Sequence, residues 1–79
     1  MDNITKFLLK LSQKQRSIIL EILEKILADT LDTLDVSSIT WKENLYRVRK
    51  WKIRIIFEKT HIWNKIIDIN FRGNIYKKY

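Results

Sequence analysis

The sequence predicts an α+β fold in which an N-terminal α-helical hairpin packs on one face of a small antiparallel β-sheet. Two observations predict it. Apolar residues recur at helical spacing through the first 28 residues, whereas between residues 45 and 71 they alternate with polar residues, as in strands with one buried face. The 79 residues are enough for a single domain, residues 1–79, with one modest core.

Two helices are expected before residue 30. Residues 3–11 predict a short helix, because four apolar residues fall on one face: Ile4, Phe7, Leu8 and Leu11. Ser12 and Gln15 match the capping-box pattern, which predicts that a second helix begins there and runs to about Ala28. Glu21 and Glu24 lie on its expected solvent side, where they would repel phosphates, so a helical hairpin on a sheet is favoured over helix–turn–helix DNA binding.

The segment from Thr30 to Glu43 has no regular period. It is polar but carries spaced apolar residues, listed here as Leu31, Leu34, Val36, Ile39 and Trp41. These are too many for a solvated linker. We therefore expect an irregular loop that crosses the molecule and is attached to the core.

Strands are expected in the second half of the chain. Two alternating runs, Leu45 to Arg49 and Lys52 to Phe57, flank Lys50 and Trp51, which predicts a tight hairpin over residues 45–58. A turn is expected over residues 59–64, and a third strand over residues 65–71. Alternation places four cations on the face away from the helices, where we expect them to be exposed: Arg47, Arg49, Lys52 and Arg54.

Charge is distributed unevenly along the chain. Residues 1–40 contain five Lys/Arg and six Asp/Glu, whereas residues 41–79 contain eleven and three, so the positive excess lies entirely in the half expected to form the sheet. Such a surface attracts polyanions, and arginine favours bidentate phosphate contacts. Solubility charge is the alternative explanation, and nucleic-acid contact is favoured over it.

Conventional catalytic sets are missing from the sequence. It contains no cysteine, no glycine-rich phosphate loop and no His/Asp/Glu set at metal-ligand spacing, and its single histidine, His61, is expected on the surface of a turn. Asp68 is expected to pair with a neighbouring cation. No apolar run is long enough to span a membrane and the N-terminus lacks signal-peptide features, so a cytoplasmic location is expected.

Chemistry on RNA remains possible with tyrosine and cations. Attack of a 2′-hydroxyl on the adjacent phosphorus needs proton removal, stabilisation of charge on the phosphoryl oxygens and a proton donor for the leaving 5′-oxygen. The tail places Tyr76 four residues after Arg72 and directly before Lys77 and Lys78. Nearby positive charge favours a phenolate. On spacing alone, however, Tyr76 is more simply an edge-strand aromatic.

The sequence motifs of the hairpin and the C-terminal tail resemble those of the RelE/ParE toxin superfamily. Members carry Y-R-[IVL]-R and Y-R-[IVL]-[IVL]-[FY] on a hairpin, then a closing strand that ends in R-x-x-[IV]-Y. The matching segments here are Leu45 to Arg49, Ile53 to Phe57 and Ile69 to Lys77, and the resemblance covers about residues 4–78.

This resemblance implies the toxin of a type II toxin–antitoxin pair, held inactive by its cognate antitoxin. In the RelE branch it implies a ribosome-dependent endoribonuclease that cleaves mRNA with neither metal nor cofactor. Carried over by position, the catalytic residues are Arg54, Arg72 and Tyr76. The residues implied to contact mRNA and ribosomal RNA are Arg47, Arg49, Lys52, Lys77 and Lys78.

This sequence departs from the family pattern at three places. Trp51 occupies a turn position where members often have glycine, so a positive φ there costs more. Asn70 replaces a residue that is basic in some ribonuclease members. Members usually begin with a strand, which is absent here, so we expect an exposed sheet edge that pairs with an antitoxin segment or a second copy. A ParE-like gyrase inhibitor without enzymatic activity and a truncated, inactive antitoxin-binding module remain alternatives.

Overall fold

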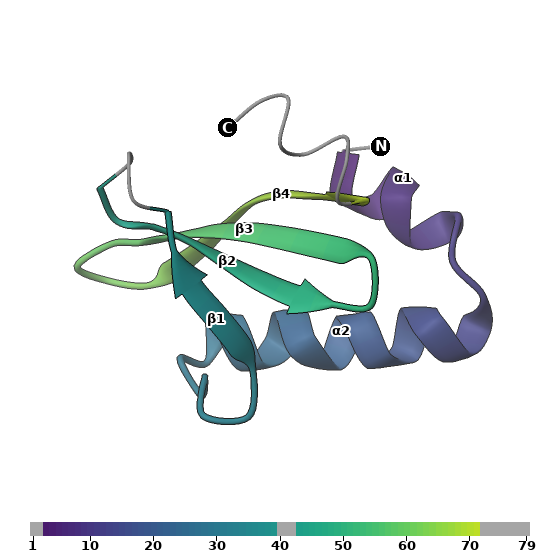
Figure 1. Ribbon diagram of the computed structural model, residues 1–79, viewed down its shortest axis with the longest axis horizontal. Helices are drawn as coiled ribbons and strands as arrows, with labels where there is room; N and C mark the ends of the chain where they lie inside the picture. Colours follow the sequence, from purple (N-terminus) through teal and green to yellow (C-terminus); the bar gives the residue numbers. More distant parts are fainter. Residues whose placement is uncertain (1–2, 40–42, 72–79) are drawn as a thin grey trace.

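The computed structural model of the chain describes residues 3–39 and 43–71. Within these residues, two helices precede a four-stranded antiparallel sheet in which the strands are ordered as in the chain, β1-β2-β3-β4 (Figure 1). The elements are α1 (Asn3–Leu9), α2 (Gln13–Leu27), β1 (Asp35–Ser38), β2 (Leu45–Lys50), β3 (Ile53–Lys59) and β4 (Asn64–Phe71). The α+β architecture with an N-terminal helical pair on the sheet is confirmed.

The start of α2 is set by the predicted capping box. The Oγ of Ser12 accepts a hydrogen bond from the backbone N–H of Gln15 at 3.2 Å, and Gln15 Oε1 accepts one from the Ser12 N–H at 3.3 Å. Two N–H groups that the helix itself leaves without a partner are thereby satisfied.

Arg16 fixes the link between the two helices. Its Nε donates to the carbonyl of Leu8 at 2.9 Å and its Nη2 to the carbonyl of Leu11 at 3.0 Å. Both carbonyls belong to the end of α1 or the link that follows. One guanidinium on the first turn of α2 therefore holds the preceding segment in place.

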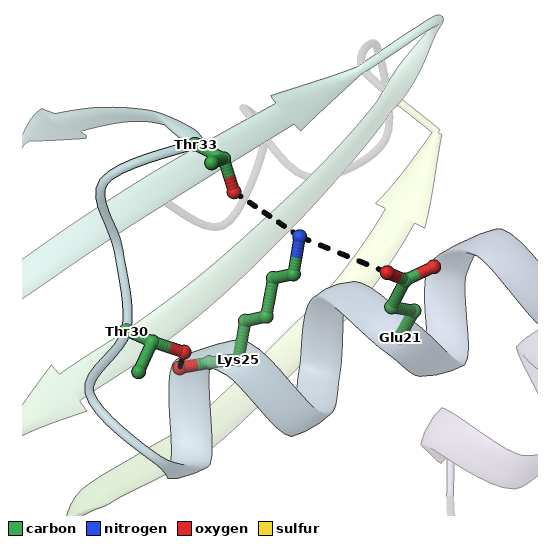
Figure 2. Close-up of polar contacts among 4 residues, drawn as sticks. All are labelled: Glu21, Lys25, Thr30 and Thr33. Atoms are coloured by element: carbon green, nitrogen blue, oxygen red, sulfur yellow. Dashed lines mark hydrogen bonds and ion pairs between the residues drawn. The ribbon is translucent and has the colours of Figure 1, made fainter.

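The segment after α2 is also tied back to that helix. Lys25 Nζ donates to Thr33 Oγ1 at 3.1 Å and lies 3.7 Å from Glu21 Oε1, and Thr30 Oγ1 donates to the Lys25 carbonyl at 3.3 Å (Figure 2). Asp29, at φ 58°, reverses the chain at the helix end. These contacts direct the chain toward the sheet.

The prediction of an irregular loop from Thr30 to Glu43 is wrong in its middle, because residues 35–38 form β1. This strand pairs antiparallel with β2, with Val36 opposite Val48 and Ser37 opposite Arg47. Its four residues contain one apolar side chain, too few to produce a detectable alternation. The strand nevertheless forms because β2 offers it a hydrogen-bonding edge.

The main core lies between the helices and the sheet. α2 runs along one side of the sheet, and α1 lies beside the end of β4 (Figure 1). Over the described ranges, the apolar residues with no exposed surface are Ile19 and Ile26 from α2 and Ile55 and Phe57 from β3. Asn64, also buried, donates from Nδ2 to the Ile26 carbonyl at 2.9 Å and to Asp29 Oδ1 at 3.0 Å, which joins the end of α2 to the start of β4.

The β2–β3 hairpin closes one residue later than the sequence suggested. Lys50 pairs with Ile53, so the loop consists of Trp51 and Lys52. Trp51 has φ 56°, the conformation expected from its place in the turn, and for a bulky side chain this is a strained backbone. The prediction that Lys52 belongs to a strand is wrong, because Lys52 lies at the hairpin tip.

Neither helix that the structure describes combines the length and apolar character needed to cross a lipid bilayer.

Candidate functional site

Among the described residues, three arginines lie on the sheet face that points away from the helices. Arg49 on β2 stands opposite Arg54 on β3, and Arg47 on β2 stands opposite Ile56. Their neighbours Val48 and Ile55 belong to the core beneath the helices, and side chains alternate between the faces of a strand. The structure thus brings Arg47, Arg49 and Arg54 together, as the alternation predicted.

The three side chains differ in exposure. Arg54 is buried, with 4% of its surface exposed. Arg47 is half-buried, and its Nε atom is buried. Arg49 is the most accessible: its side chain is 45% exposed, and its Nε donates to Asp35 Oδ2 of β1 at 2.9 Å. Of the three, Arg49 is therefore the guanidinium that an incoming anion meets first.

The expectation that the cations on this face are exposed is wrong for Arg54, which is buried. A second, smaller apolar cluster covers part of the face, with Ile39 and Ile56 buried and Leu45 and Ile67 packed against them. β3 is consequently buried on both sides from Ile53 to Phe57. A guanidinium in such surroundings interacts more strongly with an anion that reaches it, because less water screens the charge.

Acidic side chains border the arginines. Asp35 forms an ion pair with Arg49. Asp68 on β4 is 5% exposed and stands opposite Ile56, which places it diagonally across from Arg54 on the neighbouring strand. Asp68 Oδ1 also accepts a hydrogen bond from the N–H of Ile69 at 2.9 Å. Sequence reasoning missed Asp35 because it missed β1. The signal available in the sequence was an acidic residue next to Val36, within a segment too apolar to be solvated.

Lys52 does not join the arginines on the sheet face. It is exposed in the hairpin loop beside Trp51, and the Nζ of Lys50 lies 5.2 Å from the centroid of the Trp51 ring. The hairpin tip is therefore a second basic region, with an aromatic ring at its centre.

Four predicted site residues lie outside the described residues: Arg72, Tyr76, Lys77 and Lys78. Their roles as catalytic or RNA-contacting residues stay predictions. Phe71, the last residue of β4, stands opposite Ile53 on β3. Among the described residues, the predicted site therefore consists of Arg47 and Arg49 on β2, Arg54 on β3 and Lys52 in the hairpin loop.

Other catalytic inventory is sparse within residues 3–39 and 43–71. Over these ranges no group of three or more His, Cys, Asp or Glu side chains is placed to hold a metal ion. His61 is exposed in the turn between β3 and β4, as predicted. Tyr46, the one tyrosine in these ranges, stacks on Phe57 with ring centroids 5.5 Å apart and has Lys59 Nζ 5.2 Å from its ring centroid. It belongs to the core side of the sheet.

Comparison with known proteins gives one informative result. No protein-family model matches the chain, and no curated protein matches it. Among solved structures, it is similar to a chain in the crystal structure of a RelB–RelE antitoxin–toxin complex from Methanococcus jannaschii, with a TM-score of 0.75 and 23% sequence identity. The similarity covers 95% of this chain and 91% of that chain. This chain therefore has the same α+β fold as a component of that antitoxin–toxin complex.

Proposed function

We propose that this chain is the toxin of a type II toxin–antitoxin pair and that it cuts mRNA on the ribosome. The observation that carries the proposal is the opposed pair Arg49 and Arg54, with Arg47 beside them, on the helix-free face of this fold. The similarity to a chain of the RelB–RelE complex supports it. Guanidinium groups are suited to phosphate, because they donate two parallel hydrogen bonds to its oxygens.

The reaction would be an internal transfer at phosphorus. The 2′-oxygen gives up its proton to a general base and bonds to the adjacent phosphorus, while the bond to the 5′-oxygen breaks and that oxygen takes up a proton. The products are a 2′,3′-cyclic phosphate and a 5′-hydroxyl, with no net gain or loss of protons. Arg54 and Arg72 are assigned to the charge that grows on the phosphoryl oxygens, and Tyr76 to proton transfer. Arg47, Arg49, Lys52, Lys77 and Lys78 are assigned to RNA contacts, and Lys52 serves from the hairpin tip.

The burial of Arg54 favours a second candidate as well. At 4% exposure, Arg54 reaches a phosphate only if the side chains that cover it move. A role in supporting the sheet is the simpler use of such a residue. A purely structural role for Arg54 is consistent with a toxin that binds DNA gyrase and catalyses no reaction. Arg49 and the residues of the hairpin tip would then make the contacts with gyrase.

A protein antitoxin is the partner that accompanies either function. With a net charge of +7, the chain is suited to an acidic partner. Among the described strands, β1 and β4 form the two edges of the sheet, and β4 is the longer with eight residues. Addition of a partner strand along β4 would cover that edge.

Induced expression in bacteria, with primer extension on a translated message, tests the proposal. The wild-type chain should stop growth and produce cuts at defined codon positions. Arg49→Gln should reduce cleavage about 10-fold, and Arg54→Ala by about 100- to 1,000-fold, since a group that stabilises transition-state charge contributes that much. Lys14→Gln, which removes a positive charge from the exposed side of α2, is the matched control and should cleave normally.

Because Arg54 is buried, its substitution also threatens folding. Arg54→Lys keeps the charge and most of the stem, so a variant that melts like the wild type but cleaves poorly separates chemistry from stability. Intact message together with relaxed plasmid would overturn the ribonuclease proposal in favour of gyrase inhibition. Normal growth with a folded wild-type chain would overturn both functions.

A further inference from the structure

A pocket opens on the helix side of the molecule, where three separate segments meet. It has a volume of about 350 Å³ and is enclosed by the link between α1 and α2, the β2–β3 hairpin tip and the end of β4. Its apolar base includes Leu11 and Ile53, which are 6% and 2% exposed. The volume lies at the lower end of the range typical of small-ligand sites.

Two aromatic side chains line this pocket and remain accessible. Trp51 is 50% exposed and Phe71 is 43% exposed. The ring of Phe71 is held by an edge-on contact with Phe7, with centroids 5.0 Å apart and planes at 61°. Large aromatic rings are usually buried in a domain core, so two half-exposed rings beside one pocket offer stacking surface to a planar ligand.

The polar lining is basic. Lys10 and Lys52 line the pocket, with the amide of Gln15, and no carboxylate occurs among its described lining residues. By contrast, the pocket between α2 and β1 has a lining of mixed charge, with Glu21 and Asp35 beside Lys25, Arg49 and Lys50. Lys50 adds a further charge next to Trp51. The site therefore combines ring faces with two or three ammonium groups.

The pocket is preformed in the absence of a ligand. Arg16 holds the carbonyls of Leu8 and Leu11, which fixes the link that carries Lys10. Trp51 keeps its position at the hairpin tip despite the cost of φ 56°. A preformed site loses little conformational entropy on binding.

From this combination we propose that the pocket binds one nucleotide of a single-stranded nucleic acid. The base stacks on Trp51, and the neighbouring phosphates contact Lys10 and Lys52. A single strand is required because its bases can leave the stack and lie against an aromatic ring, whereas a duplex keeps them covered. The site lies on the opposite face of the sheet from Arg47, Arg49 and Arg54. It shares Lys52 with the residues assigned above to RNA contacts, but it can bind a single strand whether or not the chain cuts mRNA.

Binding of short fluorescent oligonucleotides to the full chain, without ribosomes, tests the proposal by fluorescence anisotropy. The probes are an eight-residue oligouridylate and the matching oligothymidylate. Trp51→Leu should weaken binding about 5- to 150-fold, the range for loss of one aromatic stacking partner, and Trp51→Phe should restore much of it. Trp63→Leu is the matched control, because Trp63 is 59% exposed in the β3–β4 turn and does not line the pocket.

The lysines are tested by the salt dependence of the same binding. Lys10→Gln and Lys52→Gln should each lower the slope of log K against log salt by about 0.7, the value for one phosphate contact on a single strand, and Lys14→Gln should leave it unchanged. Equal binding of both probes assigns the ligand as any single strand, and preference for oligouridylate assigns it as RNA. Equal affinities of Trp51→Leu and Trp63→Leu, or no binding by the folded wild type, would overturn the proposal while leaving message cleavage on ribosomes untouched.

Discussion

Arg49 on β2 and Arg54 on β3 stand directly opposite each other across the antiparallel pair. Like charges in this position destabilise a sheet unless something offsets them. On one side Asp35 pairs with Arg49 at 2.9 Å. Asp35 therefore offsets part of the positive charge of this pair, and the two guanidinium groups are the donors that a phosphate group would contact.

Asp35 should compete with RNA for Arg49. Asp35→Asn removes the carboxylate, so we expect binding of a single-stranded RNA oligonucleotide to tighten about two- to fivefold, in line with the small energies of exposed ion pairs. The free energy of unfolding should fall by less than about 1 kcal/mol. Fluorescence anisotropy and urea unfolding measure the two effects. Asp32→Asn, on the exposed loop before β1, is the control, and an equal gain in that variant would mean that only net charge matters.

The capping box of α2 should contribute measurably to stability. Ser12→Ala removes the hydroxyl that accepts from Gln15, and we expect the free energy of unfolding to fall by about 1 kcal/mol. Urea denaturation followed by circular dichroism measures it. Ser17→Ala makes the same chemical change at an exposed position inside the helix, where alanine is the better helix former, and should be neutral or slightly stabilising. If both variants lose stability equally, the cap is not the cause.

Asn64 should be sensitive to truncation. Asn64→Ala removes two hydrogen bonds, those to the Ile26 carbonyl and to Asp29 Oδ1, so we expect a loss of about 1–3 kcal/mol in the free energy of unfolding. Lys65→Ala, at the exposed next position, should change it by less than about 0.5 kcal/mol. Thermal unfolding of the two variants beside wild type measures the difference. If Asn64→Ala is as stable as wild type, the hydrogen bonds that join α2 to β4 through Asn64 contribute little to stability.

The backbone of Trp51 predicts an unusual order of stabilities. At φ 56° a residue with a Cβ atom is strained, whereas glycine is not. Trp51→Gly should therefore be more stable than Trp51→Ala by about 1 kcal/mol, although glycine has more conformational entropy in the unfolded chain. Denaturant unfolding gives the comparison directly. The opposite order would show that the hairpin changes its turn once tryptophan is removed.

The sequence predicted those elements whose local chemistry is strong. The capping box at Ser12, the helical spacing before residue 28 and the alternation around Val48 and Ile55 each have one structural solution, and each is confirmed. The hairpin loop was displaced by one residue, because no glycine or asparagine marks its turn and only the pairing of Lys50 with Ile53 defines it.

The errors arose where distant segments decide the outcome. Alternation correctly turned Arg54 away from the helices, but the cluster of Ile39 and Ile56, which buries part of that face, depends on a chain segment beyond β1. The continuous apolar run from Ile55 to Phe57 was a signal that both faces of β3 are covered. The roles of Arg72 and Tyr76 rest on the family resemblance and stay predictions.

The contact between Phe7 and Phe71 joins α1 to β4, so residues near the two ends of the described chain pack against each other. During synthesis α1 emerges early and has no partner in the sheet until β4 has been made. The amide hydrogens of α1 should therefore gain protection from exchange late in folding, at the same time as those of β4. A nascent chain that ends before residue 64 would contain α2 and the β2–β3 hairpin, which share core residues, but α1 would lack the strand that it packs against.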